Sequence, residues 1–229
     1  MTKMLTRPSR STRVLLDHLI DYAGLFPPAA LSMEEAVRNY ARYRAGQYAW
    51  MLGPFVVPKE RAHEVPSGFP LSVLGVDEVK NIADAKPGAF VEITGTAPIP
   101  ELARRGLRAK IRTGGDAVPS IEQVADFLRA CKATGVAFKA TAGLHHPIRN
   151  GAMHGFVNVF VAAAMVDHAE EILREEDATA FRFADDKVEW REQEVSADDL
   201  AKTRKTFALS FGSCSFEEPI DDLKELGWL

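Results

Sequence analysis

The sequence predicts an α/β fold, a TIM-like (β/α) barrel of about seven to eight parallel strands. Short apolar runs alternate with stretches of helical period, and a Gly or Pro separates most of them, which indicates parallel βαβ units. The chain has 229 residues, of which 46% are hydrophobic, so it can bury one substantial core. We expect a single barrel domain over residues 14–229, because no linker or shift in composition divides the chain.

A doubly wound open sheet is the main alternative fold. Its nucleotide-binding versions carry a GxGxxG motif or a P-loop after the first strand. Neither motif follows the first apolar run, which ends in the turn DYAGLFPP. The sequence therefore favours the barrel and points to no nucleotide-binding version of the open sheet.

Seven apolar runs bounded by turn residues supply the expected barrel strands. Pro58 stops the second run, and Thr113-Gly114-Gly115 follows the fifth. The expected strands cover residues 19–26, 50–57, 71–76, 89–94, 108–113, 137–142 and 207–212.

Capping residues mark several of the expected helices. Ser32 with Glu35, and Ser120 with Gln123, have the spacing of a capping box. Gly135 is the type of residue that follows a helix end. Residues 156–160 fit a strand or the start of a helix, and we expect one helix over 156–175 because no break follows them. The other helices are expected from Ser32, in a short segment around 79–83, and over residues 98–105, 120–134, 196–205 and 219–226.

Two segments are expected to lie outside the alternating pattern. Residues 181–193 read as a small β-hairpin insertion, with Asp185-Asp186-Lys187 as its turn. Residues 1–13 contain Lys3, Arg7, Arg10 and Arg13 and no acidic residue, so we expect a flexible basic N-terminal arm.

Charge and cysteine content limit the partners and the compartment. The net charge is −4 with both signs dispersed, which argues against a nucleic-acid or membrane-surface partner. Cys131 and Cys214 form no CxxC or metal-type pair and fit a reducing compartment. No apolar segment resembles a secretory signal or a membrane span, so we expect a cytoplasmic protein. Assembly into a homo-oligomer stays open.

The charged residues of three strands share one face. Side chains alternate along a strand, so Glu92 lies opposite Val91 and Ile93, and Lys139 lies opposite Phe138 and Ala140. By the same alternation Lys110 and Arg112 share a face. We expect the apolar faces to pack on helices and these four charges to point into the barrel, near the end where barrel enzymes place their catalytic groups.

Buried charges of this kind must pair with one another or bind an anion, because an unpaired buried charge costs several kcal/mol by rough estimate. A site for a small anionic molecule is one interpretation. A buried ion-pair network that only stabilises the fold is the other.

Residues 138–143, Phe-Lys-Ala-Thr-Ala-Gly, resemble the Schiff-base strand of the deoxyribose-phosphate type class I aldolases. In that family a barrel lysine attacks the carbonyl carbon of the substrate, so the resemblance implies that Lys139 is the nucleophile. Lys110 would then lower the pKa of Lys139 as a neighbouring cation. More broadly, the chain is similar to an uncharacterised bacterial (β/α)-barrel family, a likeness that brings no assigned activity.

The loop after this strand holds three of the six histidines, His145, His146 and His154, together with Arg149 and Asn150. With Glu92 or Asp21, the histidines would offer ligands for a divalent metal with an open position for water. Their spacing matches no standard metal signature. We therefore expect no cofactor and favour a single histidine, His145, as general acid or base.

Two glycine-containing loops follow strands and offer backbone N–H groups to phosphate or carboxylate, at residues 113–115 and 212–215. Cys214 in the second loop lacks an identifiable base, which argues against its use as a nucleophile. The expected catalytic residues are Glu92, Lys110, Lys139 and His145. The expected substrate-binding residues are Arg112, Gly114, Gly115, Thr141, His146, Arg149, Asn150, His154, Ser210 and Ser213.

Three functions are consistent with these residues. The first is a lyase or aldolase-like enzyme that acts on an anionic carbonyl substrate through Lys139. The second is a metal-dependent hydrolase or isomerase that uses the loop histidines. The third is a non-catalytic binding protein whose inner charges form a structural network.

Overall fold

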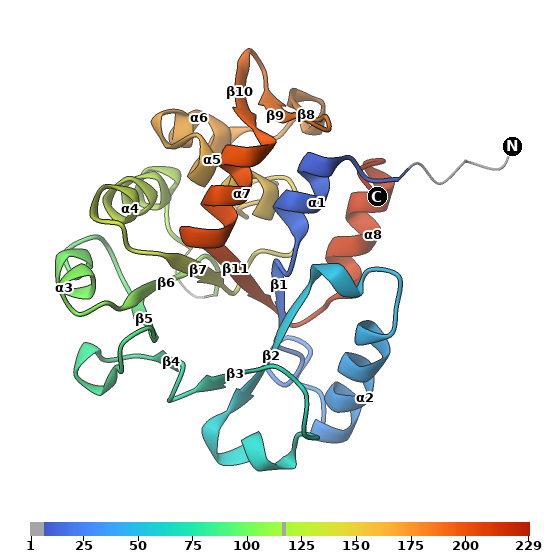
Figure 1. Cartoon of the computed structure of the whole chain (residues 1–229), viewed down its shortest axis with the longest axis vertical. Helices are drawn as coiled ribbons and strands as arrows, with labels where there is room; N and C mark the ends of the chain where they lie inside the picture. The colour runs from blue at the N-terminus through green and yellow to red at the C-terminus, as the bar shows by residue number, and fades with distance from the viewer. Residues whose placement is uncertain (1–6, 116–117) are drawn as a thin grey trace, which may run out of the picture.

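The computed structural model describes residues 7–115 and 118–229 and contains a closed barrel of eight parallel strands (Figure 1). Around the barrel the strands follow the order β1-β11-β7-β6-β5-β4-β3-β2. The predicted barrel is thus confirmed, and the open sheet is wrong. The strands are β1 (Ile20–Tyr22), β2 (Leu52–Pro58), β3 (Leu71–Leu74), β4 (Glu78–Val79), β5 (Phe90–Ile93), β6 (Arg108–Arg112), β7 (Phe138–Thr141) and β11 (Ala208–Ser213).

Strand β4 replaces a helix that the sequence predicted around residues 79–83. Glu78 pairs with Leu74 of β3 and with Phe90 of β5, so this short strand bridges its two neighbours. Only a 3-10 turn, η3 (Ile82–Asp84), follows it. The helix prediction is wrong because a strand of two residues is too short to show a period in the sequence.

The capping boxes form as predicted. Helix α2 (Met33–Arg44) begins after Ser32, and α4 (Ile121–Thr134) begins after Ser120. Gly135 ends α4 with φ 70°, in the left-handed region that glycine adopts readily. Three further predicted helices are also present, α3 (Ile99–Arg104), α7 (Ala197–Thr206) and α8 (Glu217–Glu225).

The helix predicted over residues 156–175 is interrupted. It begins at Phe156 as expected, but α5 (Phe156–Ala164) stops before Met165, and a 3-10 turn, η4 (Val166–His168), leads into α6 (Ala169–Arg174). The Asn158 side chain donates hydrogen bonds to the carbonyl oxygens of Ile172 and Glu175, at 2.7 and 2.9 Å. These bonds hold the end of α6 against α5, which a single straight helix would not allow.

The N-terminal segment is not an arm throughout. Helix α1 (Arg10–Leu16) starts after Ser9, whose side chain accepts a hydrogen bond from the backbone N–H of Thr12. Leu15 and Leu16 of this helix are buried. The arm predicted over residues 1–13 is therefore wrong from Arg10 onward, and residues 1–6 lie outside the described residues.

The predicted hairpin has a third strand. Strands β8 (Phe181–Phe183), β9 (Lys187–Trp190) and β10 (Gln193–Ser196) form a small antiparallel sheet, separate from the barrel. This sheet follows a 3-10 turn, η5 (Ala178–Ala180), and leads directly into α7.

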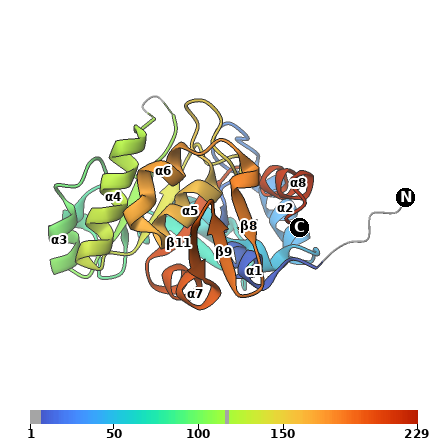
Figure 2. The ribbon, with the colours of Figure 1, turned by 90° about the horizontal axis from the view of Figure 1, so that it is seen from above.

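Helices cover the barrel unevenly. Figure 2 shows α3 and α4 on one side of the barrel and α2 and α8 on the other. Between β2 and β5 the connections hold only short 3-10 segments, η2 (Lys59–Glu64) and η3, and another, η1 (Ala49–Met51), precedes β2. Across residues 7–115 and 118–229, no helix combines the length and the apolar character needed to cross a membrane.

Candidate active site

Charged side chains from neighbouring strands meet inside the barrel, as the alternation of faces predicted. Glu92 of β5 lies beside Lys110 of β6, and Lys110 lies beside Lys139 of β7. The opposite faces of these strands are buried and apolar, with Val91 and Ile111 among their residues. Packing of the apolar faces against the surrounding helices therefore directs the charges inward.

Glu78 is the carboxylate that joins the two lysines, and sequence reasoning missed it. Its Oε1 accepts a hydrogen bond from Lys139 Nζ at 2.6 Å, and its Oε2 accepts one from Lys110 Nζ at 3.1 Å. Ser72 Oγ donates a third, at 2.5 Å, to Oε1. Glu78 lies on a strand of only two residues, so the alternation of side chains gave no signal for its position.

Lys139 is buried between two carboxylates. Its side chain is 2% exposed, and its Nζ lies 2.5 Å from Asp21 Oδ2 and 2.6 Å from Glu78 Oε1. Burial alone would lower the pKa of Lys139, but the charges of Asp21 and Glu78 more than reverse this and raise it. The expectation that Lys110 lowers the pKa of Lys139 is therefore wrong, because the two carboxylates lie in direct contact with Nζ.

Asp21 has one oxygen in the network and one outside it. Its Oδ2 accepts hydrogen bonds from Lys139 and from Ser210 Oγ, the latter at 2.9 Å. Its Oδ1 is buried and has no hydrogen-bond partner among the described residues. Burial raises the pKa of Asp21, and attraction to Lys139 only partly opposes that rise. A side chain at Gly53 would collide with Oδ1, so glycine leaves room for this carboxyl group.

The two buried carboxyl groups thus have opposite pKa shifts. Burial would raise the pKa of Glu78, but Lys139 and Lys110 together lower it to about 2. Asp21 has a single lysine partner and the repulsion of Glu78, and its pKa is raised. Of the two, Asp21 is the group that holds a proton more readily. A division of this kind between neighbouring carboxyl groups is typical of acid–base sites.

A chain of ion pairs continues from this centre to the mouth of the barrel. Lys110 Nζ lies 2.9 Å from Glu92 Oε2, and Arg112 Nε lies 3.2 Å from Glu92 Oε1. Burial would raise the pKa of Glu92, but its bonds to Lys110 and Arg112 lower it. The Arg112 side chain is 50% exposed, which leaves part of its guanidinium group available at the mouth.

A cavity of about 700 Å³ opens at the carboxyl ends of the strands, above the charged centre. Glu78, Lys110 and Lys139 line it from within the barrel, and Arg112 lines it nearer the mouth. One part of its wall is polar or glycine-rich and comes from β6, β7, β11 and the loops after them. The other part is apolar, and its residues are Ala23, Phe26, Pro27, Pro28, Val56, Leu74, Val118, Leu144 and Met153.

Gly114 and Gly143 bring two loops of this wall into backbone contact. A Cβ atom on Gly143 would lie 2.7 Å from Gly114 Cα, and one on Gly114 would lie 2.6 Å from Gly143 Cα. Gly143 also has φ 81°, in the left-handed region. Close packing is thus one reason for glycine at Gly114, and the expected contact of its N–H with an anion stays a prediction.

The three loop histidines have different hydrogen-bond partners and do not form a ligand set. His145 Nδ1 lies 3.1 Å from Glu218 Oε2, and His146 Nδ1 lies 2.6 Å from Asp222 Oδ2. Both carboxylates belong to α8. His154 is buried, with Nε2 at 2.8 Å from the carbonyl oxygen of Pro119, and burial lowers its pKa.

The predicted metal ligands are therefore separated. Asp21 and Glu92, the carboxylates expected to complete a metal site, contact lysines instead. Within residues 7–115 and 118–229, no group of three or more His, Cys, Asp or Glu side chains is arranged to hold a metal ion.

The cavity brings together some of the predicted site residues and leaves others out. Arg149 lies near Glu176, at 3.7 Å, and Asn150 forms a turn with Met153. The residues that line the cavity are Lys110, Arg112, Gly114, Gly115, Lys139, Thr141, His145 and Ser213. Those that do not line it are Glu92, His146, Arg149, Asn150, His154 and Ser210. Glu92 and Ser210 still contact the charged centre through Lys110 and Asp21.

In comparisons with known proteins, no family model and no curated protein matches the sequence.

Proposed function

We propose that the protein is an enzyme of the lyase or aldolase type, which uses Lys139 as an amine nucleophile on the carbonyl carbon of a small anionic substrate. One observation carries the proposal. Lys139 lines the cavity, and its Nζ lies 2.5 Å from the buried carboxyl group of Asp21, whose pKa is raised. An amine must lose a proton before it attacks a carbonyl group, and a carboxyl group of raised pKa is suited to accept that proton.

The opposite pKa shifts of the two carboxyl groups suggest their roles. Asp21 Oδ2 accepts the proton of the Lys139 ammonium group across their hydrogen bond, which leaves a neutral amine. Glu78, with a pKa of about 2, stays ionised and holds Lys110 beside the reacting centre. Lys110 then supplies a fixed positive charge for the developing negative charge on the substrate oxygen.

The covalent step balances with these groups alone. The Lys139 nitrogen forms a bond to the carbonyl carbon, the carbon–oxygen bond breaks, and the oxygen leaves as water with two protons from the amine. Asp21 returns its proton to the nitrogen, so the product is a protonated imine. This group accepts the electron pair of an adjacent carbon–carbon bond when that bond breaks, which is the chemistry of a lyase.

The walls of the cavity suggest the shape of the substrate. Arg112 and Lys110 favour a carboxylate or phosphate group on the polar side. The apolar part of the wall, with Phe26, Val56 and Leu74, offers a surface for an apolar group. We therefore propose an anionic carbonyl compound that also carries an apolar group.

Reductive trapping tests the proposal. The protein is incubated with pyruvate, 2-oxooctanoate or phenylpyruvate, and borohydride is added to convert an imine into a stable secondary amine. We expect a mass increase with the 2-oxo acids that carry an apolar group, and its loss in Lys139→Met. Lys202→Met, at an exposed position of α7, is the matched control and keeps the adduct. Absence of an adduct with all three compounds contradicts the proposal.

A non-catalytic binding protein is the second candidate, and one observation favours it. The four central charges of Glu78, Glu92, Lys110 and Lys139 all have partners without any substrate. If the protein only binds its ligand and the network is purely structural, carboxylates should bind without forming a covalent adduct. Equilibrium binding of octanoate, which has no carbonyl carbon that reacts with an amine, separates the two functions when it is measured beside the trapping reaction.

A further inference from the structure

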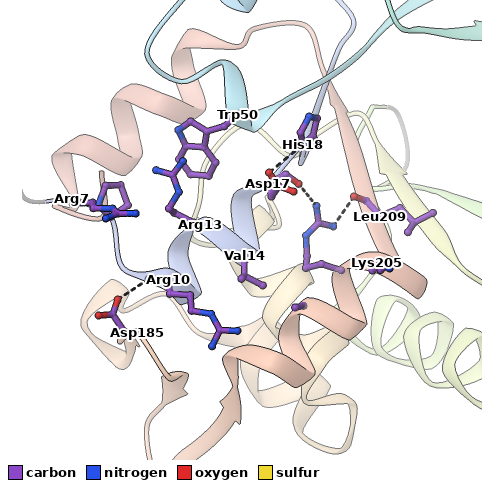
Figure 3. A pocket seen from close by; sticks show the side chains of 13 residues that line it. Arg7, Arg10, Arg13, Val14, Asp17, His18, Trp50, Asp185, Lys205 and Leu209 are labelled. Atoms are coloured by element: carbon purple, nitrogen blue, oxygen red, sulfur yellow. Dashed lines mark hydrogen bonds and ion pairs between the residues drawn. The ribbon is translucent and has the colours of Figure 1, made fainter.

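A second pocket lies at the opposite end of the barrel from the cavity. His18 precedes β1, Trp50 precedes β2, and Leu209 lies near the start of β11, so the pocket opens at the amino ends of the strands. Its volume is about 1070 Å³. Figure 3 shows the side chains that line it. Helices α1 and α7 supply most of its other residues.

The pocket concentrates positive charge in a chain whose net charge is −4. Its lining includes five arginine and lysine side chains and only two carboxylates, those of Asp17 and Asp185. The cations are Arg7, Arg10, Arg13, Arg204 and Lys205. Arg10 is already paired, with Asp198 at 2.5 Å, but Arg13 and Lys205 have no carboxylate partner among the described residues.

Arg204 adds a buried charge that forms no direct ion pair with a carboxylate within residues 7–115 and 118–229, although the charges of Asp17 and Asp21 act on it from further away. Its guanidinium group donates hydrogen bonds to the carbonyl oxygens of Leu15 at 2.9 Å, Asp17 at 3.0 Å and Leu209 at 2.6 Å, and also to that of Ala208. Burial lowers its pKa to about 10, so it stays charged at neutral pH. A buried cation whose hydrogen bonds all go to neutral carbonyl oxygens contributes a positive potential to the pocket beside it.

The Arg13 side chain stacks on Trp50, and this contact leaves its N–H donors available. Its guanidinium carbon lies 4.5 Å from the centre of the Trp50 ring, and Figure 3 shows the two side chains stacked. Stacking uses the face of a guanidinium group and leaves its N–H edge available for an anion. Lys205, from the last turn of α7, faces the same pocket.

We infer that this pocket binds a small polyanion, a molecule with two or more phosphate or carboxylate groups. Arg13 and Lys205 contact the anionic groups, and Arg204 provides the fixed positive background. The pocket is much larger than one phosphate group, and Arg13 and Lys205 come from different helices, which suits a ligand with several charges. This inference does not depend on the chemistry proposed for the cavity.

Calorimetric titration of the full chain tests the inference with four probes: inorganic phosphate, pyrophosphate, ADP and citrate. We expect pyrophosphate, ADP or citrate to bind more tightly than inorganic phosphate, and the affinity to fall steeply as salt is added. Preference for pyrophosphate or ADP identifies a phosphate ligand, and preference for citrate identifies a carboxylate ligand. Absence of binding by all four probes overturns the inference.

Variants of α1 and α7 test the site, and two lysines of α7 supply the matched comparison. Lys205→Gln, and separately Arg13→Gln, should weaken binding by about tenfold or more, as loss of a charge-assisted hydrogen bond does. Lys202→Gln removes the same charge from α7 at an exposed position outside the pocket and should leave the affinity unchanged. Equal weakening by Lys202→Gln and Lys205→Gln contradicts a specific site. Thermal unfolding checks that each variant is folded, and fluorescence of Trp50, compared with Trp50→Phe, reports binding beside Arg13.

Discussion

Asp21 and Lys139 lie 118 positions apart in the sequence and form a buried ion pair, with Nζ and Oδ2 at 2.5 Å. They belong to β1 and β7, which are not adjacent in the barrel. The strand between them, β11, supplies Ser210, which donates a hydrogen bond to the same oxygen. The pair therefore depends on the closure of the barrel, and loss of either member affects both stability and the proposed chemistry.

Removal of the Lys139 ammonium group should leave the buried carboxyl group of Asp21 without its cationic partner. We predict that Lys139→Met lowers the free energy of unfolding by about 3–5 kcal/mol, the usual cost when one member of a buried pair is removed. Urea denaturation measures the change. Asp21→Asn combined with Lys139→Met should recover part of the loss, because the stranded carboxyl group is then gone. Lys202→Met, at an exposed position, should change the stability by less than about 0.5 kcal/mol.

Because the pKa of Glu78 is low in the folded protein, the free energy of unfolding should depend on pH in the acid range. Its pKa is about 2 in the folded protein and 4.5 ordinarily, so the unfolded chain binds the proton more tightly. Its contribution is fully present above pH 4.5 and is lost as the pH falls toward 2. At about 1.4 kcal/mol per pH unit, the contribution amounts to about 3 kcal/mol.

The measurement is the difference in unfolding free energy between the native protein and Glu78→Gln, followed from pH 7 downward. We predict a constant difference above about pH 5 and a smaller one at each step below it. Glu225→Gln, on the exposed surface of α8, should leave the unfolding free energy within about 0.5 kcal/mol of the native value. A difference that does not change with pH contradicts the role assigned to the Glu78 ion pairs.

Alanine substitutions at two glycines of similar backbone conformation distinguish the cost of backbone strain from the cost of a steric collision. Gly143 and Gly88 have φ of 81° and 83°, so alanine brings a similar backbone cost at both. A Cβ atom at Gly143 would lie 2.7 Å from Gly114 Cα, whereas at Gly88 nothing lies within 4 Å. We predict that Gly143→Ala destabilises the protein by about 2 kcal/mol more than Gly88→Ala, measured by urea denaturation. Equal losses would show that Gly143 is needed only for its backbone angle.

In the proposed reaction, Asp21 accepts the proton that Lys139 releases. We predict that Asp21→Asn slows imine formation at neutral pH by about 100-fold, the usual scale for loss of a proton acceptor. Binding of octanoate should persist, because Asp21 does not line the cavity. Loss of this carboxylate also lowers the pKa of Lys139, so the residual rate should reach its plateau at a lower pH than in the native protein. An unchanged rate contradicts the assignment.

The sequence predicted the residues whose position follows from local alternation. Glu92, Lys110 and Lys139 lie on strands of four or five residues, and a period of two shows which way each side chain points. Their carboxylate partners depend on contacts between distant strands. Glu78 is 61 positions from Lys139 and lies on a strand of two residues, where no period is visible.

In the histidine-rich loop, too, contacts between distant residues could not be predicted from the sequence. The concentration of His145, His146 and His154 suggested one chemical site, but concentration in sequence does not place side chains together in space. Glu218 and Asp222 are four positions apart on α8, and this spacing presents both carboxylates to the loop, one to each of the first two histidines. Such a contact, more than 70 positions away, has no signal in a single sequence.

The most direct test of the proposed function is the location of the trapped adduct. After borohydride treatment with 2-oxooctanoate, proteolysis and mass spectrometry identify the modified lysine. The proposed function predicts that the added mass lies on Lys139, the lysine in contact with Asp21, whose pKa is raised. Lys110 should stay unmodified, because the pKa values of both its carboxylate partners, Glu78 and Glu92, are lowered and neither is suited to accept its proton. An adduct on Lys110 or on surface lysines, with Lys139 unmodified, would contradict it.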